Sequence, residues 1–321
     1  MQWLMQWSRR PQAEQYLQPS FSKSRIFNGL VVALLVIGAH RLFAGLPDRD
    51  PRPDARAVVR FEPVQLDAAG FAPLTLAGAW RVTSAESRMG GVSALALDGG
   101  GLLALSDSGV LIRLPRPASA TGIAEFRDLP AGPRRGYYKA GRDSEALVRE
   151  SNGRGWWVAF ENFHSAWLFD RDLKRVIRTV DLNPLGWPAN LGGEGAVSTA
   201  DGLLLLFPES GDEVVRLTDK GTERLPIANR YGRLSDAAML PGGRIVVIAR
   251  SYSPAGFSSR LLLFDKGVMR PLARLALGRL DNAEAIAAEP LAGGGVRLWV
   301  MTDNDFRRRV PTLLVAFDWR G

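Results

Sequence analysis

The chain reads Gly192-Gly193-Glu194-Gly195-Ala196-Val197 and then, five residues later, Leu203-Leu204-Leu205-Leu206-Phe207-Pro208-Glu209. This segment joins a glycine turn and a carboxylate to a short apolar run that ends in a second carboxylate. Similar segments occur four more times along the chain. We name the polar residue at the start of each segment the first anchor, and the polar residue that ends its apolar run the second anchor. The first anchors are Ser93, Glu145, Glu194, Asp236 and Glu284, and the second anchors are Asp107, Glu161, Glu209, Arg250 and Asp303.

Successive first anchors lie 52, 49, 42 and 48 residues apart. A repeat of roughly 40–50 residues indicates a propeller or another repeat array. Further runs rich in β-branched and apolar residues follow each second anchor, which gives about four strands per repeat. The sequence therefore predicts an all-β fold, a β-propeller of five or six four-stranded blades. A β-sandwich is the structural alternative, but it does not explain five copies of one pattern.

The last repeat ends at Trp319 without its outermost strand. Two strand-like runs, at 58–61 and 74–82, precede the first repeat and belong to no repeat of their own. We expect these N-terminal strands to complete the last blade and close the ring.

The N-terminal part differs from the repeats. Residues 1–25 are polar and basic, and residues 29–39 form an uninterrupted apolar run. The run has the length of a signal-peptide core, and residues 26–46 together make a marginal membrane span. We predict a signal or membrane-anchor helix at 1–46, a linker rich in Pro, Asp and Arg at 47–57, and the propeller at 58–321. The expected location is periplasmic or secreted. Residues 26–46 are either cleaved off or remain as an anchor in the cytoplasmic membrane, and both alternatives stay open.

Composition excludes several function classes. The formal net charge is +8, and residues 1–45 hold a surplus of four basic residues, so the remainder is too mildly basic to indicate nucleic-acid binding. The chain has no cysteine, which excludes disulfides and thiol chemistry. We therefore expect no nucleic-acid partner, and membrane contact only through the N-terminal segment.

Six acidic anchors are candidate metal ligands. Equivalent positions of successive blades lie on a circle about the propeller axis, so the first anchors should form one ring at a channel mouth. The second anchors should form a nearby ring, at the same or the opposite mouth. Converging carboxylates repel unless cations neutralise them, and oxygen ligands favour Ca²⁺ or Mg²⁺ over zinc. The alternative is that the acids accept backbone N–H bonds between blades. The candidate metal ligands are Asp107, Glu145, Glu194, Glu209, Glu284 and Asp303.

Three residues outside this metal set, His164, Glu161 and Arg250, are candidates for catalysis. His164 follows Glu161 closely and can serve as a general base. Arg250 replaces an acid in the fourth repeat, so it can pair with the acidic ring or clamp an anionic group. The chain lacks the G-x-S-x-G serine-hydrolase elbow. Ser93 comes nearest to it, without the second glycine.

Several of these motifs resemble the phytase-like family, also described as esterase-like activity of phytase. The resemblance covers about residues 75–317. It implies a β-propeller and hydrolysis of phosphoester or carboxylic ester bonds, and hence a small anionic or ester substrate. The chain differs from the family in having Ala146 and Ala285 where the family tends to have glycine. The matching segments are Gly90 to Leu95, Leu103 to Asp107, Asp143 to Leu147, Phe160-Glu161, Gly192 to Gly195, Asn282 to Ile286 and Thr302 to Phe306.

The resulting hypothesis is an exported, metal-assisted hydrolase of phosphoester or carboxylic ester bonds, with Ca²⁺ or Mg²⁺ as its cofactor. Two alternatives stay open. One is a non-catalytic propeller that binds a ligand or partner, and the other is a lactonase-like calcium propeller.

Overall fold

The computed structural model describes residues 51–134, 139–254, 256–278, 282–307 and 310–321. The predicted signal or anchor helix at 1–46 lies outside these residues, as does the start of the linker. Among the described residues, no helix is long and apolar enough to cross a membrane. The first strand, β1 (Ala55–Pro63), begins three residues before the predicted start of the propeller.

The strands of the described chain form five antiparallel groups of four, which we number as blades one to five. Blade one contains β3 (Val92–Asp98), β4 (Gly101–Ser106), β5 (Val110–Leu114) and β6 (Thr121–Asp128). Blade two contains β7 (Ser144–Arg149), β8 (Gly155–Phe160), β9 (Ser165–Asp170) and β10 (Val176–Asp181). Blade three contains β11 (Gly193–Ser198), β12 (Leu204–Pro208), β13 (Glu213–Thr218) and β14 (Gly221–Pro226). Blade four contains β15 (Arg233–Met239), β16 (Ile245–Ser253), β17 (Gly256–Asp265) and β18 (Val268–Leu275).

Blade five contains β19 (Asn282–Pro290), β20 (Val296–Asp303), β21 (Thr312–Trp319) and, from the other end of the domain, β2 (Thr75–Ser84). β2 pairs with β21 from Thr75 opposite Asp318 to Val82 opposite Thr312. β1 then bridges β2 and β6, so that blades five and one form one nine-stranded sheet. The N-terminal strands therefore supply the missing strand of the last repeat, as the sequence predicted.

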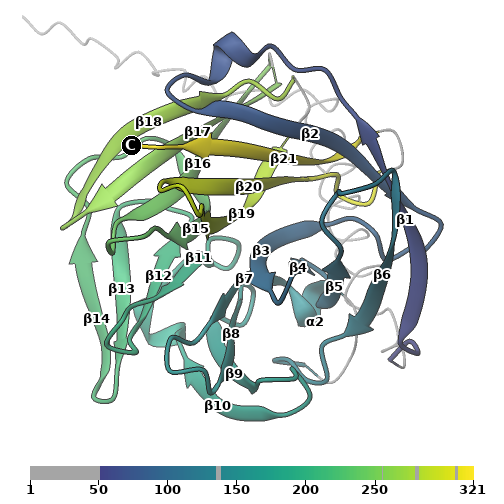
Figure 1. Cartoon of the computed structure of the whole chain (residues 1–321). Coiled ribbons are helices and arrows are strands. Elements are labelled where there is room, and N and C mark those ends of the chain that lie inside the picture. The colour runs from purple at the N-terminus through teal and green to yellow at the C-terminus, as the bar shows by residue number, and fades with distance from the viewer. Residues whose placement is uncertain (1–50, 135–138, 255, 279–281, 308–309) are drawn as a thin grey trace, which may run out of the picture. The chain divides into compact units, whose positions relative to one another are not determined.

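The innermost strands of the five blades lie side by side in the order β3, β7, β11, β15, β19 and back to β3 (Figure 1). This closed ring of inner strands, with the other strands farther out, is the arrangement of a β-propeller. The described chain forms five such blades rather than six.

The apolar core is divided among the five interfaces between neighbouring blades. Leu204 and Leu206 of β12 pack toward blade two, whereas Leu205 and Phe207 of the same strand pack toward blade four. Successive side chains of a strand point to opposite faces, and both faces of this sheet are covered. This explains why the central strands read as continuous apolar runs rather than as alternating ones.

Gly195 permits the close approach of two inner strands. A Cβ atom at this position of β11 would lie 2.8 Å from the backbone nitrogen of Ala237 in β15. At Gly193, on the same strand, the nearest atoms would lie at an ordinary 3.8 Å. We expect Gly195→Ala to lower the free energy of unfolding by about 1–3 kcal/mol through overpacking, and Gly193→Ala to change it little. Urea denaturation of both variants measures this, and equal losses would contradict the close-approach explanation.

Candidate functional site

A β-bulge near the start of every inner strand positions the first anchors. In each blade the strand register shifts by one residue, between Val92 and Ala94 in blade one and at the equivalent points of the others. The extra residue of a bulge is left out of the ladder pairing, and the strand bends at that point. The extra residues of the five blades are Ser93, Glu145, Glu194, Ser235 and Glu284.

The bulges correct the assignment of the fourth repeat. The extra residue of β15 is Ser235, because the register shifts between Leu234 and Asp236. Asp236 is paired opposite Ile248, and its carboxylate accepts the backbone N–H groups of Ala237 and Ile286, both at 2.7 Å. Asp236 thus joins blade four to blade five. Asp236 therefore follows the alternative to metal binding, in which the carboxylate accepts backbone N–H groups and connects neighbouring blades.

The second anchors lie at the same end of the blades as the first. The backbone nitrogen of Asp107 donates to the carbonyl of Gly91 at 2.8 Å, and that of Glu161 donates to Asp143 at 2.8 Å. Glu209 makes the same bond to Gly192 at 3.0 Å. In an antiparallel hairpin the start of one strand pairs with the end of the next. Both sets of anchors therefore lie at the same mouth of the channel. Of the two positions expected for the second anchors, the structure has the same mouth and not the opposite one.

Nine of the ten anchors, all except Asp236, line one cavity of about 240 Å³. All six predicted metal ligands are among the lining residues, and so are Glu161 and Arg250. The cavity also has three polar or basic residues that the anchor pattern does not include. The lining side chains that bear charge are Asp107, Lys139, Glu145, Glu161, Glu194, Glu209, Arg233, Arg250, Glu284 and Asp303.

Two arginines of blade four neutralise one acid of blade three and one of blade five. Arg250 forms an ion pair with Glu284, and its Nη2 lies 3.5 Å from Oε1 of Glu209. Arg233 Nη1 lies 3.1 Å from both carboxylate oxygens of Glu209. Glu209 and Glu284 thus already have cationic partners.

Lys139 is the cation that neutralises acids of blades one and two. It belongs to the short helix α2 (Lys139–Arg142), and its Nζ bonds to Asp107 and lies 3.9 Å from Oδ1 of Asp143. Burial nevertheless raises the pKa of Asp107 to about 6, because the Lys139 charge offsets only part of the desolvation. The neighbouring carboxylates in turn raise the pKa of Lys139 above its ordinary value.

Four of the carboxylates that line the cavity form no ion pair within the described chain. Three of them, Glu145, Glu161 and Glu194, belong to blades two and three. The fourth, Asp303 of blade five, accepts the backbone N–H of Asp305. Burial first, and then the neighbouring carboxylates, raise the pKa of Glu145 and that of Glu194 well above the ordinary range. Burial and the adjacent Asp143 raise the pKa of Glu161 to about 7. Such groups carry a high electrostatic cost unless protons or a cation neutralise them.

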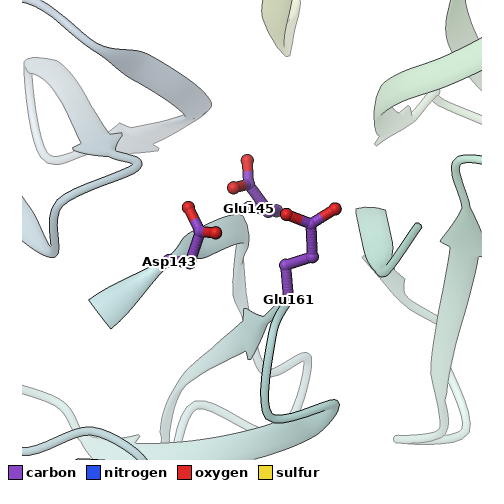
Figure 2. Close-up of side chains that lie close together, drawn as sticks. All are labelled: Asp143, Glu145 and Glu161. Atoms are coloured by element: carbon purple, nitrogen blue, oxygen red, sulfur yellow. The ribbon is translucent and has the colours of Figure 1, made fainter. Parts of the chain in front are cut away.

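Two overlapping groups of three carboxylates come close enough to share an ion, and Glu161 belongs to both. One oxygen each from Asp143, Glu145 and Glu161 lie within 4.8 Å of one another, and Figure 2 shows the three side chains converging. One oxygen each from Glu161, Glu194 and Glu209 also lie within 4.8 Å of one another. Oδ1 of Asp143 is buried and has no hydrogen-bond partner among the described residues. An all-oxygen donor set with uncompensated charge fits Ca²⁺ or Mg²⁺.

His164 lies apart from this arrangement. It is not among the residues that line the cavity. Its Nε2 is 3.1 Å from the carbonyl oxygen of Pro188, and its ring packs edge-on against Trp187 at 5.8 Å. His164, the predicted general base, therefore lies outside the cavity.

The sequence analysis missed Asp143 and Arg233 as members of the site. Both stand two residues before the bulge residue of their blades, the position that Gly91, Gly192 and Asn282 occupy in the others. This constant offset was a signal available in the sequence. It was obscured because the five residues at that position differ in charge and size.

A family model described as "Phytase-like: Esterase-like activity of phytase" matches residues 87–306. The chain belongs to this family. The match covers all five pairs of anchors, and it confirms the resemblance predicted from the motifs. None of the curated proteins compared with this phytase-like chain matches it.

Several solved structures are similar to the phytase-like chain at low identity. Glutaminyl cyclase of Myxococcus xanthus is 12% identical with a TM-score of 0.46, over 84% of this chain and 99% of that one. A catalytically inactive virginiamycin B lyase of Staphylococcus aureus with quinupristin is 10% identical with a TM-score of 0.45, over 81% and 99%. Hydrazine synthase of Kuenenia stuttgartiensis is 14% identical with a TM-score of 0.37, and the match spans 70% of this chain and only 59% of that protein's chain. Because all three TM-scores lie below 0.5, we infer nothing about function from them.

The raised pKa values predict that stability falls as pH rises when no metal is bound. The folded-state pKa is about 6 for Asp107 against 3.8, and about 7 for Glu161 against 4.5. Between about pH 4 and pH 7 the folded state therefore holds protons that the unfolded chain releases, so the free energy of unfolding decreases with pH. We expect wild type to lose about 1–3 kcal/mol more than Glu161→Gln between pH 5 and pH 8 in chelator. Urea denaturation across this range checks it, and parallel curves would contradict it.

Proposed function

We propose that this protein is a metal-assisted hydrolase of phosphoester bonds, with Ca²⁺ or Mg²⁺ held by Glu145, Glu161 and Glu194. The observation that supports it is the unequal neutralisation of the cavity. Asp107, Glu209 and Glu284 are paired with Lys139, Arg233 or Arg250, whereas Glu145, Glu161 and Glu194 are buried or half-buried and form no ion pair among the described residues. A bound divalent cation supplies that missing charge, polarises a phosphoryl oxygen and lowers the pKa of a bound water.

The remaining side chains suit the binding of an anionic group. Arg233 and Arg250 line the cavity on one side and Lys139 lines it on the other. The Arg233 side chain is 64% exposed, so it can reach a ligand at the mouth. Asp107, whose pKa is about 6, can hold or release a proton near neutral pH.

The size and charge of the cavity favour a phosphomonoester over a neutral ester. Pockets for drug-sized ligands measure about 300–1,000 Å³, and this cavity measures about 240 Å³. It therefore admits the phosphoryl group and leaves the rest of the substrate outside. A phosphomonoester dianion gains more than a carboxylic ester from the three flanking cations.

Turnover assays test the proposal directly. We expect hydrolysis of 4-nitrophenyl phosphate that requires Ca²⁺ or Mg²⁺ and stops in chelator, with weaker activity on aryl acetates and lactones. Preference for carboxylic esters or lactones would overturn the substrate class. No turnover on any of the three classes, while calorimetry shows bound Ca²⁺, would favour a non-catalytic binding propeller instead.

We also propose that the protein is exported, because an apolar run and a polar linker precede the propeller in the sequence. Cell fractionation tests this, and a full-length chain in the cytosol would overturn it. N-terminal sequencing of the mature protein distinguishes signal cleavage from anchoring.

A further inference from the structure

A second pocket opens beside the central cavity, over blade four. Its volume is about 640 Å³, and it shares Glu209, Arg233 and Arg250 with the central cavity. Its other walls are Arg230, Gly232, Ser251, Tyr252 and Phe257. Because the two spaces have three lining residues in common, a ligand whose phosphoryl group occupies the central cavity can extend into this pocket.

The pocket exists because one hairpin of blade four is longer than its counterparts. β8 and β12 end one residue before their second anchors, whereas β16 continues three residues past Arg250 to Ser253. Ser251, Tyr252 and Ser253 pair with Ser258, Phe257 and Gly256 of β17. Three residues at about 3.3 Å each carry the hairpin about 10 Å beyond the level of the anchors.

The extended hairpin presents an aromatic surface at the mouth. Tyr252 and Phe257 are cross-strand partners whose ring centroids lie 5.0 Å apart. The Tyr252 residue is 74% exposed, although its ring has a large apolar area. Aromatic rings of this kind bind other rings by stacking and by burial of apolar area.

The charge around this surface is positive. The pocket has three arginines and one acid, and that acid, Glu209, already pairs with Arg233 and Arg250. Arg230 donates to the carbonyl of Ser210 at 2.6 Å and forms no ion pair within the described chain. The pocket thus combines an aromatic surface with a guanidinium that has no acidic partner.

We propose that this pocket is a leaving-group subsite that makes the enzyme prefer aryl over alkyl phosphomonoesters. The inference rests on the proposed hydrolase function. The aromatic ring of the substrate lies against Tyr252 and Phe257 while its phosphoryl group occupies the central cavity. Water adds to phosphorus, the bond from phosphorus to the aryl oxygen breaks, and the products are inorganic phosphate and a phenol. Arg230 lies where it can stabilise the negative charge that develops on the departing aryl oxygen.

The test compares kcat/KM for phenyl phosphate with kcat/KM for ethyl phosphate in the full chain with Ca²⁺. We expect Tyr252→Ser to lower the phenyl-to-ethyl ratio roughly 3–10-fold. Ile177→Ser serves as the matched control, because Ile177 is an apolar residue of β10 with 52% exposure outside both pockets. An unchanged ratio in Tyr252→Ser, or an equal change in the control, would overturn the subsite.

A binding measurement separates failure of the subsite from failure of the hydrolase proposal. Phenylphosphonate and methylphosphonate cannot be hydrolysed in the same way, and calorimetry gives their Kd values with Ca²⁺ present. Tighter phenylphosphonate binding that Tyr252→Ser removes, without any turnover, would retain the subsite and overturn the hydrolase. Turnover with equal affinity for both phosphonates would do the reverse. Neither turnover nor binding would overturn both.

Discussion

Glu194→Gln is expected to lower Ca²⁺-dependent turnover by at least about 100-fold. Replacing even an outer-shell partner of a metal typically costs about 10–100-fold in affinity or activity, and Glu194 is proposed as a direct ligand. The Glu194 residue is 5% exposed, and its carboxylate forms no ion pair among the described residues. A neutral amide at this position therefore removes negative charge from the part of the cavity where negative charge is least compensated.

The same substitution should not destabilise the metal-free protein. Burial raises the pKa of Glu194 well above its ordinary value, so the unfolded chain releases a proton that the folded state retains, and stability is lost as pH rises. Glutamine has no proton to release and does not repel Glu161. We therefore expect Glu194→Gln to melt at or above the wild-type temperature in chelator at pH 8.

Thermal melting with Ca²⁺ and with chelator checks this expectation. Wild type should gain about 2.7 kcal/mol when Ca²⁺ is at 100 times its Kd, and Glu194→Gln should gain almost nothing. Glu125→Gln is a suitable control, because the Glu125 side chain is 51% exposed on β6. Equal destabilisation of Glu194→Gln in both conditions, with no Ca²⁺ effect on wild type, would refute the metal site.

Asp236→Leu should have the opposite effect, a large loss of stability that is independent of metal. The buried Asp236 carboxylate accepts the N–H groups of Ala237 and Ile286 between blades four and five. Burial raises the pKa of Asp236, and these donors offset part of that rise. Leucine fills a similar volume but offers no acceptor, and each buried unsatisfied donor costs about 1–3 kcal/mol. We expect a loss of about 2–5 kcal/mol.

Asp236→Asn is the matched variant, because its amide oxygen keeps one acceptor of similar shape. Urea denaturation in chelator and in Ca²⁺ should rank wild type above Asp236→Asn and Asp236→Asn above Asp236→Leu, in the same order under both conditions. A loss in Asp236→Leu that appears only with Ca²⁺ would place Asp236 in the metal site instead of between the blades.

The sequence by itself determined the repeat, the strand content and most of the cavity. Runs such as residues 203–207 are apolar throughout because both faces of the central strands are covered, and this favours strands that belong to stacked blades. The spacing of the anchors required equivalent side chains to meet near one axis, and all six acids assigned to the metal do line one cavity. The expected closure by the N-terminal strands is confirmed by the pairing of β2 with β21.

Only the tertiary structure decided which acids are neutralised and which are not. Ser235 and Asp236 are neighbours in the sequence, and the bulge in β15 alone determines which of them occupies the anchor position. The partners of Glu209 and Glu284 come from residues 24 to 41 positions away, so no local pattern predicts them. Ion pairs depend on where side chains from separate blades converge, and that geometry follows from closure of the ring. The same closure leaves Glu145, Glu161 and Glu194 without a cation.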